Sequence, residues 1–249
     1  MNIFKFPQLA PNLFRGFHIL KLFLLISTIS NAQKEANIWH FGEFAGLDFN
    51  SGAPFALTNG ALNTLEGCAT IADNIGNLLF YTDGNRVWNK NHVQMPNGFA
   101  LMGNSSSTQS AVIVQKPGSS NIYYIFTVPF QDQPNIGLRY SIVDMNLDGG
   151  LGDITTKNIF LYSYLTEKLT AVRHANDCDV WVIAHEYESN AFIVYLLDNS
   201  GVNAGPVSNV GSIHSQDWAD NNTVGQLKAS PDGQQARLSY IVLRSSRTF

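Results

Sequence analysis

The sequence predicts an all-β protein with a β-propeller-like fold, built from about three and a half antiparallel blades that form an open or incomplete ring. The first observation is composition: only 14% of the 249 residues are charged and 45% are hydrophobic, with 20 glycines. This balance is typical of proteins made of many short strands and turns. The second is that hairpins recur. The third is that their first strands begin near residues 69, 110, 169 and 225, at intervals typical of propeller blades.

The first hairpin unit is "ATIADNIGNLLFYTDGNRVWNKN", residues 69–91. A short strand leads into a turn at Asn74–Asn77, and a hydrophobic strand follows at Leu78–Tyr81. A second turn at Asp83–Gly84 leads into a third strand through Val87–Trp88. Asn, Asp and Gly are residues that favour such turns, so the unit predicts a small antiparallel sheet.

Two further units repeat this scheme, with strands expected in residues 110–128, 137–145 and 157–162, and then in 169–187, 191–197 and 206–212. Their first turns lie at Pro117–Gly118 and Ala175–Asp177. A fourth unit begins in residues 224–242, with a turn at Pro231–Gly233. A β-sandwich of irregular hairpins is the alternative, but the regular spacing favours propeller blades.

The two ends of the chain are expected to belong to one blade. The early strands "NIWHFG" (37–42) and "AGLDF" (45–49) look like outer strands whose inner strands come from the C-terminus. The segment "ARLSYIVLRSSRTF" completes one hairpin with "GQLKAS" but does not close the ring. Residues 234–249 also contain three arginines and no acid, so we expect a truncation or frameshift soon after Gly233. The open edges of such an arc favour association.

Five long stretches resemble one known family, and they lie at residues 37–98, 103–128, 137–154, 167–186 and 227–233. They are similar to the N-terminal propeller-like region of large exported proteins of gliding bacteria that use the type IX secretion system. The resemblance spans residues 37 to 233, and it implies display at the cell surface or outside the cell. It implies no catalytic residues. After Gly233 nothing continues the family pattern, and no sorting domain follows.

Residues 1–32 have the pattern of a cleavable signal peptide. Three basic residues and no acid accompany the apolar run 22–29, and Ser30 and Ala32 place small residues before a cut after Ala32. Eight apolar residues are far fewer than the roughly 20 that span a membrane, so no span is expected in the mature chain. Cleavage would change the formal charge from −4 to −7, which argues against nucleic acid as a partner.

The two cysteines, Cys68 and Cys178, are expected to remain free thiols. Cys68 leads into the first strand of one blade, whereas Cys178 lies at the turn after the corresponding strand two units later. In a propeller these points lie at opposite ends of the channel, and a disulfide needs Cα atoms within about 7 Å.

One segment resembles half of a calcium-binding loop. Asp144, Asn146 and Asp148 alternate before Gly149, which provides oxygen ligands and a sharp turn. The twelfth position is Thr155, where a bidentate Glu belongs. A polar turn between two outer strands is therefore the alternative, and no other cofactor is indicated.

No other residue pattern indicates catalysis. The five histidines after the signal peptide are scattered without the zinc-site spacing: His40, His92, His174, His185 and His214. There is neither a G-x-S-x-G nor a G-x-G-x-x-G motif. The tryptophans offer a sugar-stacking platform, although Trp88 and Trp181 sit in apolar strands typical of a core, whereas Trp218 is expected to be exposed.

These observations predict an exported, non-enzymatic propeller-like module that binds an unknown protein or glycan. Any site is expected in the interblade loops 103–109, 131–136 and 213–223. The alternative is a carbohydrate-active enzyme, a hydrolase or lyase, which requires two carboxylates about 5 to 10 Å apart across a pocket. The candidates are Glu66, Asp83, Glu167 and Glu186. A third possibility is a non-functional gene fragment.

Overall fold

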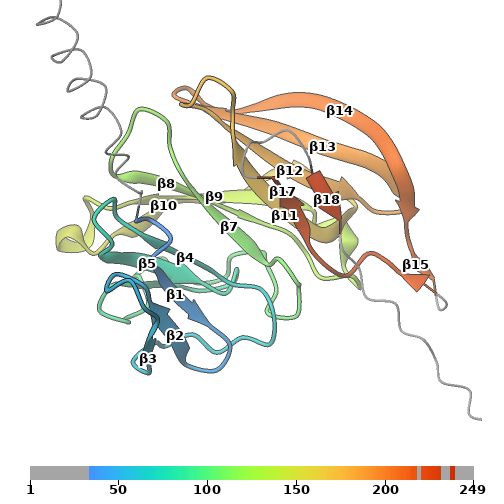
Figure 1. Cartoon of the computed structure of the whole chain (residues 1–249). Coiled ribbons are helices and arrows are strands. Elements are labelled where there is room, and N and C mark those ends of the chain that lie inside the picture. Colours follow the sequence, from blue (N-terminus) through green and yellow to red (C-terminus); the bar gives the residue numbers. More distant parts are fainter. Residues whose placement is uncertain (1–33, 218–219, 231–235, 239–249) are drawn as a thin grey trace, which may run out of the picture. The chain divides into compact units, whose positions relative to one another are not determined.

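The computed structural model describes residues 34–217, 220–230 and 236–238 (Figure 1). They belong to the second of two units, Lys34–Phe249. This part of the chain is all-β, as predicted, and its regular structure consists of antiparallel strands with two short 3₁₀ turns. The predicted signal peptide, most of the predicted aberrant tail and Trp218 lie outside the described residues. Within the described ranges, no helix is long and apolar enough to cross a membrane.

The N-terminal half of the described chain forms two three-stranded sheets. The first has the order β1 (Ile38–Phe41), β2 (Ala45–Asp48) and β3 (Phe55–Leu57). The second has the order β4 (Ala69–Ala72), β5 (Leu78–Thr82) and β6 (Val87–Asn89). The second sheet agrees with the predicted first unit, including its turns.

Two four-stranded sheets follow. One has the order β10 (Asp153–Tyr162), β9 (Leu138–Asp144), β8 (Ile122–Thr127) and β7 (Ala111–Gln115), with η1 (Pro134–Ile136) and η2 (Asp148–Gly150) in its connections. The other contains β11 (Leu165–Arg173), β12 (Val180–Glu186), β13 (Ser189–Asp198) and β14 (Gly201–His214). Two short hairpins end the described part: β15 (Gln216–Asp217) with β16 (Asp220–Asn221), and β17 (Leu227–Ala229) with β18 (Ala236–Leu238).

The first strands of successive sheets lie beside one another, as the inner strands of propeller blades do. β4 contacts β7, β7 contacts β11, and β11 contacts β17. The hairpin of β17 and β18 agrees with the predicted pairing of "GQLKAS" with the tail, and Leu227 lies opposite Leu238. None of the described sheets closes into a barrel, which is consistent with an incomplete propeller-like arrangement.

The first sheet departs from the prediction. The early strands were expected at the outer positions of a blade completed by the C-terminus, but β1 lies beside the inner strand β4. Side chains of β4 and the residue before it hold it there: the N–H of His40 donates to Thr70 Oγ1 at 3.0 Å, and the Cys68 thiol donates to the His40 carbonyl at 3.4 Å. In the described residues, β1, β2 and β3 form a sheet separate from β17 and β18.

The core consists of the apolar faces between these sheets. Phe80 on β5 and Tyr123 on β8 are buried and meet edge to face, with ring centroids 5.5 Å apart. Trp88 is buried against Tyr81 with rings stacked at 5.5 Å, so it packs in the core as predicted. Burying a large aromatic side chain contributes about 2 to 3 kcal/mol. Phe80 and Tyr123 therefore stabilise the contact between two sheets, whereas Trp88 and Tyr81 stabilise the sheet of β4, β5 and β6.

Several strands are longer than predicted, among them β11, which begins at Leu165 where a strand was expected from residue 169, and β13, which covers Ser189–Asp198 where 191–197 was expected. β10 begins at Asp153 where a strand was expected from residue 157, and β14 covers Gly201–His214 where only 206–212 was expected. The ladders of β10 and β14 contain register shifts, and β14 includes Gly, Asn and Ser residues that rarely favour strands. The cysteine prediction is confirmed: Cys68 and Cys178 are both free.

Candidate functional site

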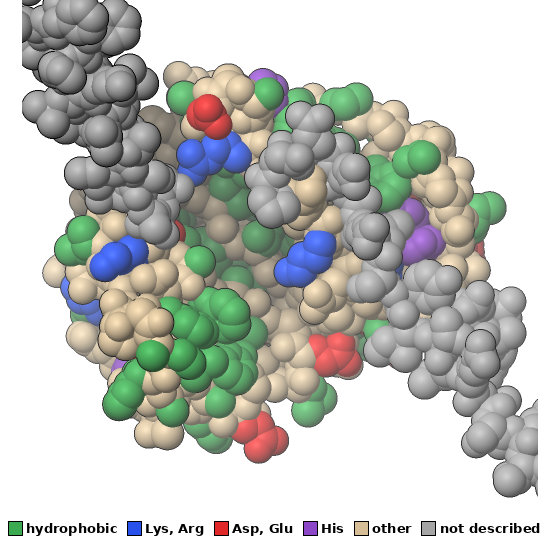
Figure 2. Space-filling view, viewed as in Figure 1, with side chains coloured by type: hydrophobic (Ala, Val, Ile, Leu, Met, Phe, Trp, Pro, Cys, Tyr) green, Lys and Arg blue, Asp and Glu red, His purple; other side chains and the backbone are tan. Residues whose placement is uncertain are grey.

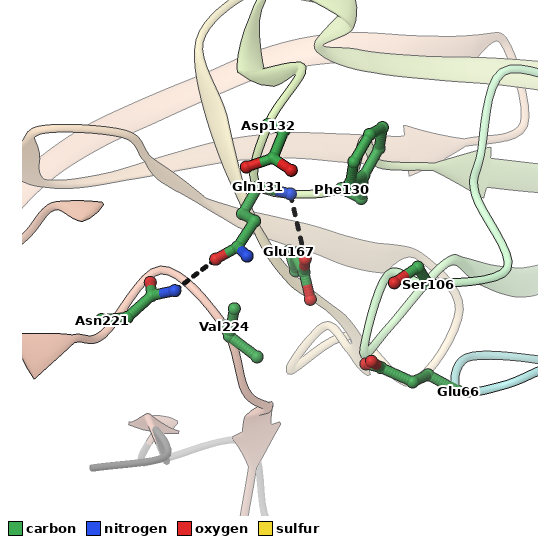
Figure 3. Close-up of a pocket in the computed structure, with 8 residues that line it drawn as sticks. All are labelled: Glu66, Ser106, Phe130, Gln131, Asp132, Glu167, Asn221 and Val224. Carbon is green, nitrogen blue, oxygen red and sulfur yellow. Dashed lines mark hydrogen bonds between the residues drawn. The ribbon is translucent and has the colours of Figure 1, made fainter. Parts of the chain in front are cut away.

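A pocket lies where loops from several sheets meet. Its cavity has a volume of about 280 Å³, and its lining consists of Glu66, Ser106, Phe130, Gln131, Asp132, Glu167, Asn221 and Val224. Figure 3 shows these side chains gathered around one space. Each of the three interblade loops expected to build a site contributes to it: 103–109 through Ser106, 131–136 through Gln131 and Asp132, and 213–223 through Asn221.

Glu167 on β11 forms the buried wall of this pocket. Its side chain is 1% exposed. One carboxylate oxygen accepts the N–H and the hydroxyl of Thr108, both at 2.8 Å, and the other accepts the N–H of Gln131 at 3.0 Å. Burial raises the pKa of Glu167, and the nearby charge of Glu66 also raises it, while the hydrogen bonds from Thr108 and Gln131 act in the opposite direction. The carboxylate therefore fastens two loops to β11.

Thr108 connects two carboxylates. Its hydroxyl lies 2.8 Å from Glu167 Oε2 and 3.1 Å from Glu66 Oε2, and it accepts the N–H of Gly225 at 3.2 Å. Since each oxygen is one hydrogen bond away from the same hydroxyl, the two carboxylates lie within about 6 Å of each other. Of the four predicted carboxylates, Glu66 and Glu167 are thus brought together.

The other two predicted carboxylates have separate structural roles. Asp83 Oδ1 accepts the N–H groups of Asn85 and Arg86 and so stabilises the turn between β5 and β6. Glu186 accepts the hydroxyl of Tyr162 at 2.5 Å, and this bond, with burial, raises the pKa of Tyr162 to about 12. Neither residue lines the pocket.

Two more side chains hold backbone segments near the pocket: Lys168, which is buried, and Gln109, which is partly buried. Lys168 is 0% exposed, and its Nζ donates to the carbonyls of Asn222 and Val224 at 2.8 and 2.9 Å. Burial lowers the pKa of Lys168 to about 8. Gln109 Oε1 accepts the N–H groups of Leu169 and Leu227. The sequence did not single out either residue, because the hydrogen bonds that a Lys or Gln side chain makes to distant segments leave no local sequence pattern.

The remaining polar groups of the pocket suit a ligand rich in hydroxyls. Gln131 accepts the Asn221 amide through its oxygen, so its own amide nitrogen stays at the cavity (Figure 3). Asp132 Oδ1 accepts Gln216 Nε2 at 3.1 Å, which leaves its second oxygen for a ligand. Together with the Ser106 hydroxyl and the Phe130 ring, the lining offers donors, acceptors and one aromatic surface.

The predicted calcium loop has its oxygens in local contacts. Asp144 Oδ1 accepts both the backbone and the side-chain N–H of Asn146 at 2.9 Å, and Asn146 Oδ1 accepts the Asn121 amide at 3.0 Å. Asp148 begins the turn η2. Among the residues that the structure describes, no three His, Cys, Asp or Glu side chains group to hold a metal. These contacts fit the polar-turn alternative, and the calcium site stays a prediction.

Two histidines from different strands form a buried pair away from the pocket. His185 on β12 is 0% exposed, and its ring lies 4.3 Å from that of His214 on β14. His185 Nδ1 lies 2.9 Å from the Glu186 carbonyl oxygen. Because a carbonyl oxygen can only accept, Nδ1 carries the proton and donates this hydrogen bond. The pair is therefore part of the packing between β12 and β14.

A scan against protein-family models, a search of curated proteins and a search of solved structures found no match to this chain. The resemblance to exported proteins of gliding bacteria therefore rests on the residues quoted above.

Proposed function

We propose that this protein is an exported, non-catalytic binding module and that the pocket between its loops takes the end of a glycan. The observation that carries this proposal is the burial of Glu167 and the hydrogen bonds that its carboxylate accepts. Its two oxygens already accept three hydrogen bonds from Thr108 and Gln131, and it is almost completely buried. A carboxylate held in this way fixes the shape of a pocket, and it has little capacity left to act on a substrate.

The ligand class follows from the lining. Sugar hydroxyls both donate and accept, and the pocket presents carboxylate acceptors at Asp132 and Glu66 with an amide donor at Gln131. Phe130 adds an aromatic ring of the kind that packs on the apolar face of a sugar. The cavity of about 280 Å³ suits one or two sugar units better than a folded protein surface.

A carbohydrate-active enzyme is the second candidate, and one observation favours it. Glu66 and Glu167 both contact the hydroxyl of Thr108, so their separation resembles the roughly 5 Å of a retaining glycosidase. In that reaction one carboxyl group donates a proton and the other attacks the sugar. The three hydrogen bonds to Glu167 argue against the second role, which requires an oxygen free to form a bond.

The two candidate functions are distinguished by testing one panel of bacterial and plant polysaccharides for binding and for hydrolysis. We expect one polysaccharide to bind the purified protein without release of reducing ends. Gln131→Ala and Asp132→Asn should each weaken binding about tenfold or more, because each removes a group that faces the ligand. Asp177→Asn, at an exposed turn outside the pocket, is the matched control.

Release of reducing ends by the parent protein, abolished by Glu66→Gln, would favour the enzyme. If no polysaccharide binds, or if the two pocket variants bind as tightly as Asp177→Asn, the pocket is not a glycan site.

A further inference from the structure

Another pocket lies between the sheet of β4, β5 and β6 and the loop that leads into β7. Its cavity has a volume of about 290 Å³, and its lining consists of Asn63, Asp83, Asn85, Arg86, Gly103, Asn104 and Ser105. We call it the asparagine pocket. Every residue of this lining is polar, charged or glycine, so the pocket suits a polar ligand.

The asparagine pocket repeats, one sheet earlier in the chain, the position of the pocket around Glu167. In each case the loop after the second strand of a sheet lines a cavity together with a segment that belongs to the next sheet. Asp83–Arg86 follows β5 and meets the loop before β7, and Phe130–Asp132 follows β8 and meets Glu167 on β11. Residues 103–105 line one pocket and Ser106 lines the other. Both pockets are therefore built from connections between strands, where propellers place their binding sites.

Backbone contacts set the shape of the asparagine pocket. The N–H of Gly103 donates to the Gly84 carbonyl at 2.9 Å. A Cβ atom at Gly103 would lie 2.7 Å from that carbonyl oxygen, so the two turns approach this closely only because residue 103 is glycine. The Thr64 hydroxyl also lies 3.2 Å from the Ser105 carbonyl oxygen. The pocket is thus formed before a ligand binds, which lowers the entropic cost of binding.

Two asparagine side chains in the lining keep hydrogen-bonding groups for a ligand. Asn85 donates its amide N–H to the Leu101 carbonyl at 2.9 Å, so its oxygen remains as an acceptor. Asn104 uses its oxygen to accept the N–H of Ser106 at 2.9 Å, so its amide nitrogen remains as a donor. A donor beside an acceptor matches sugar hydroxyls, which both donate and accept.

Arg86 provides the available charge of the pocket. Its side chain is exposed, and within the described ranges it takes part in no hydrogen bond or ion pair. The acid of the lining, Asp83, is only 7% exposed, and its Oδ1 already accepts the backbone N–H groups of Asn85 and Arg86. A guanidinium presents its N–H donors in one plane, and two of them match the two oxygens of a carboxylate.

Basic side chains are otherwise sparse on the surface. On the face that Figure 2 shows, Lys and Arg side chains are few and lie apart from one another. The chain has 15 basic residues against 19 acidic ones. Polyanions that bind through charge alone need an extended basic face. A single guanidinium in a polar pocket instead fits a single acidic group.

We propose that the asparagine pocket binds an acidic sugar, a uronic acid, with its carboxylate on Arg86 and its hydroxyls on Asn85 and Asn104. The class of ligand rests on the proposed function, and the inference adds that the glycan carries an acidic sugar. The pocket around Glu167 suits a neutral sugar, because the carboxylates in its lining repel another carboxylate. A glycan that contains both kinds of sugar therefore fits both pockets.

NMR titration of the isotope-labelled protein tests this proposal. The probes are methyl galacturonoside and methyl galactoside, which differ only at C6, where the first has a carboxylate and the second a hydroxymethyl group. We expect the galacturonoside to shift the backbone amides of residues 83–86 and 103–105 and to bind there at least about tenfold more tightly than the galactoside. The amides of Gln131 and Asp132 report on the pocket around Glu167 in the same spectra.

Arg86→Gln should weaken binding of the galacturonoside at least about tenfold, because it removes the charged partner of the carboxylate. Arg86→Lys should retain part of the affinity, since it keeps the charge and loses the planar pair of donors. Lys90→Gln is the matched control: Lys90 is exposed and directly follows β6, outside the pocket. Circular dichroism melting shows that each variant is folded.

Equal affinity for the two glycosides, or equal binding by Arg86→Gln and Lys90→Gln, would overturn the proposal. So would acetate or a tetraglutamate peptide that shifts residues 83–86 and 103–105 as strongly as the galacturonoside does, because the pocket would then recognise any carboxylate. Shifts at Gln131 and Asp132 alone would also overturn it and would leave the proposed glycan site around Glu167 standing. Shifts at 83–86 and 103–105 alone would support it and count against that other site.

Discussion

At the scale of single residues, the pocket depends on two buried charges that are adjacent in sequence. Glu167 and Lys168 lie next to each other on β11, in the stretch where its ladder with β12 has a register shift. Glu167 fastens Thr108 and Gln131, and Lys168 fastens the carbonyls of Asn222 and Val224. Buried charges persist only where such partners satisfy them. These two adjacent positions of β11 thus hold loops that line the cavity.

Glu167→Ala should destabilise the protein by about 3 kcal/mol, because the partly buried donors of Thr108 and Gln131 would lose their acceptor. Urea denaturation monitored by tryptophan fluorescence measures the change. Glu66→Ala is the control: it removes the exposed partner of the same Thr108 hydroxyl and should cost less than about 1 kcal/mol. Equal effects of the two substitutions would contradict the structural role of Glu167.

The sequence identified Glu66 and Glu167 as candidates, but it did not predict that they pair. The contact between them runs through Thr108, which the sequence placed only within the interblade loop 103–109. Glu66, Thr108 and Glu167 are far apart in the chain and meet only because of how the sheets pack. Local sequence patterns do not predict that packing. The loops were predictable because propeller connections lie at the ends of the blades, whereas the side chains that lock them were not.

At the scale of elements, β12 and β14 are joined through a pair of histidines. His185 and His214 are both buried with their rings in contact. Burial lowers the pKa of each to about 4, and the charge of Lys168 also lowers it, while His214 has a further lowering effect on His185. Neutral imidazoles therefore fit this position, and a protonated one does not.

The stability of the protein should fall as pH decreases from about 6.5 to about 4. In the unfolded chain these histidines have the ordinary pKa of 6.5, so the unfolded state binds protons first over this interval and is favoured. Each histidine accounts for about 2 to 2.5 kcal/mol, so we expect the pair to cost about 5 kcal/mol at pH 4.5 relative to pH 7. Urea denaturation at a series of pH values measures it. His185→Leu should reduce the slope, and an unchanged slope in that variant would show that the pair is not responsible.

Strands with turn residues at both ends were predictable, and strands rich in small polar residues were not. The turn of Asp83 and Gly84 separates β5 from β6 where expected, because Gly84 adopts a positive φ of 86°. β14 extends beyond its predicted bounds because Asn203 and Ala204 pair with β13, and this pairing outweighs their weak preference for strands. The ends of such strands are set by pairing with a neighbouring strand, which the propensities of the residues do not predict.

At the scale of the whole molecule, the described sheets are joined by side chains and not by shared ladders. Gln109, just before β7, is the clearest case. Its Oε1 accepts the N–H groups of Leu169 on β11 and Leu227 on β17, and its Nε2 donates to the Leu227 carbonyl at 3.1 Å. The short sheet of β17 and β18 has only a two-stranded ladder of its own, which is marginally stable in isolation. Its attachment to the larger sheets therefore depends on this contact and on the buried side chain of Leu227.

Gln109→Ala should release β17 before any other described strand. Three hydrogen bonds are lost and the N–H of Leu227 is left without its acceptor, so local opening of this hairpin becomes easier while the larger sheets keep their own ladders. Hydrogen exchange measured by mass spectrometry should show at least about tenfold faster exchange in residues 225–230, with protection of β4 to β6 unchanged. Gln115→Ala is the matched control, since Gln115 lies at the other end of β7 and bonds only locally, to the Ser119 carbonyl. If exchange increases equally in both variants, or throughout all sheets in Gln109→Ala, the last sheet is not held in place by this residue.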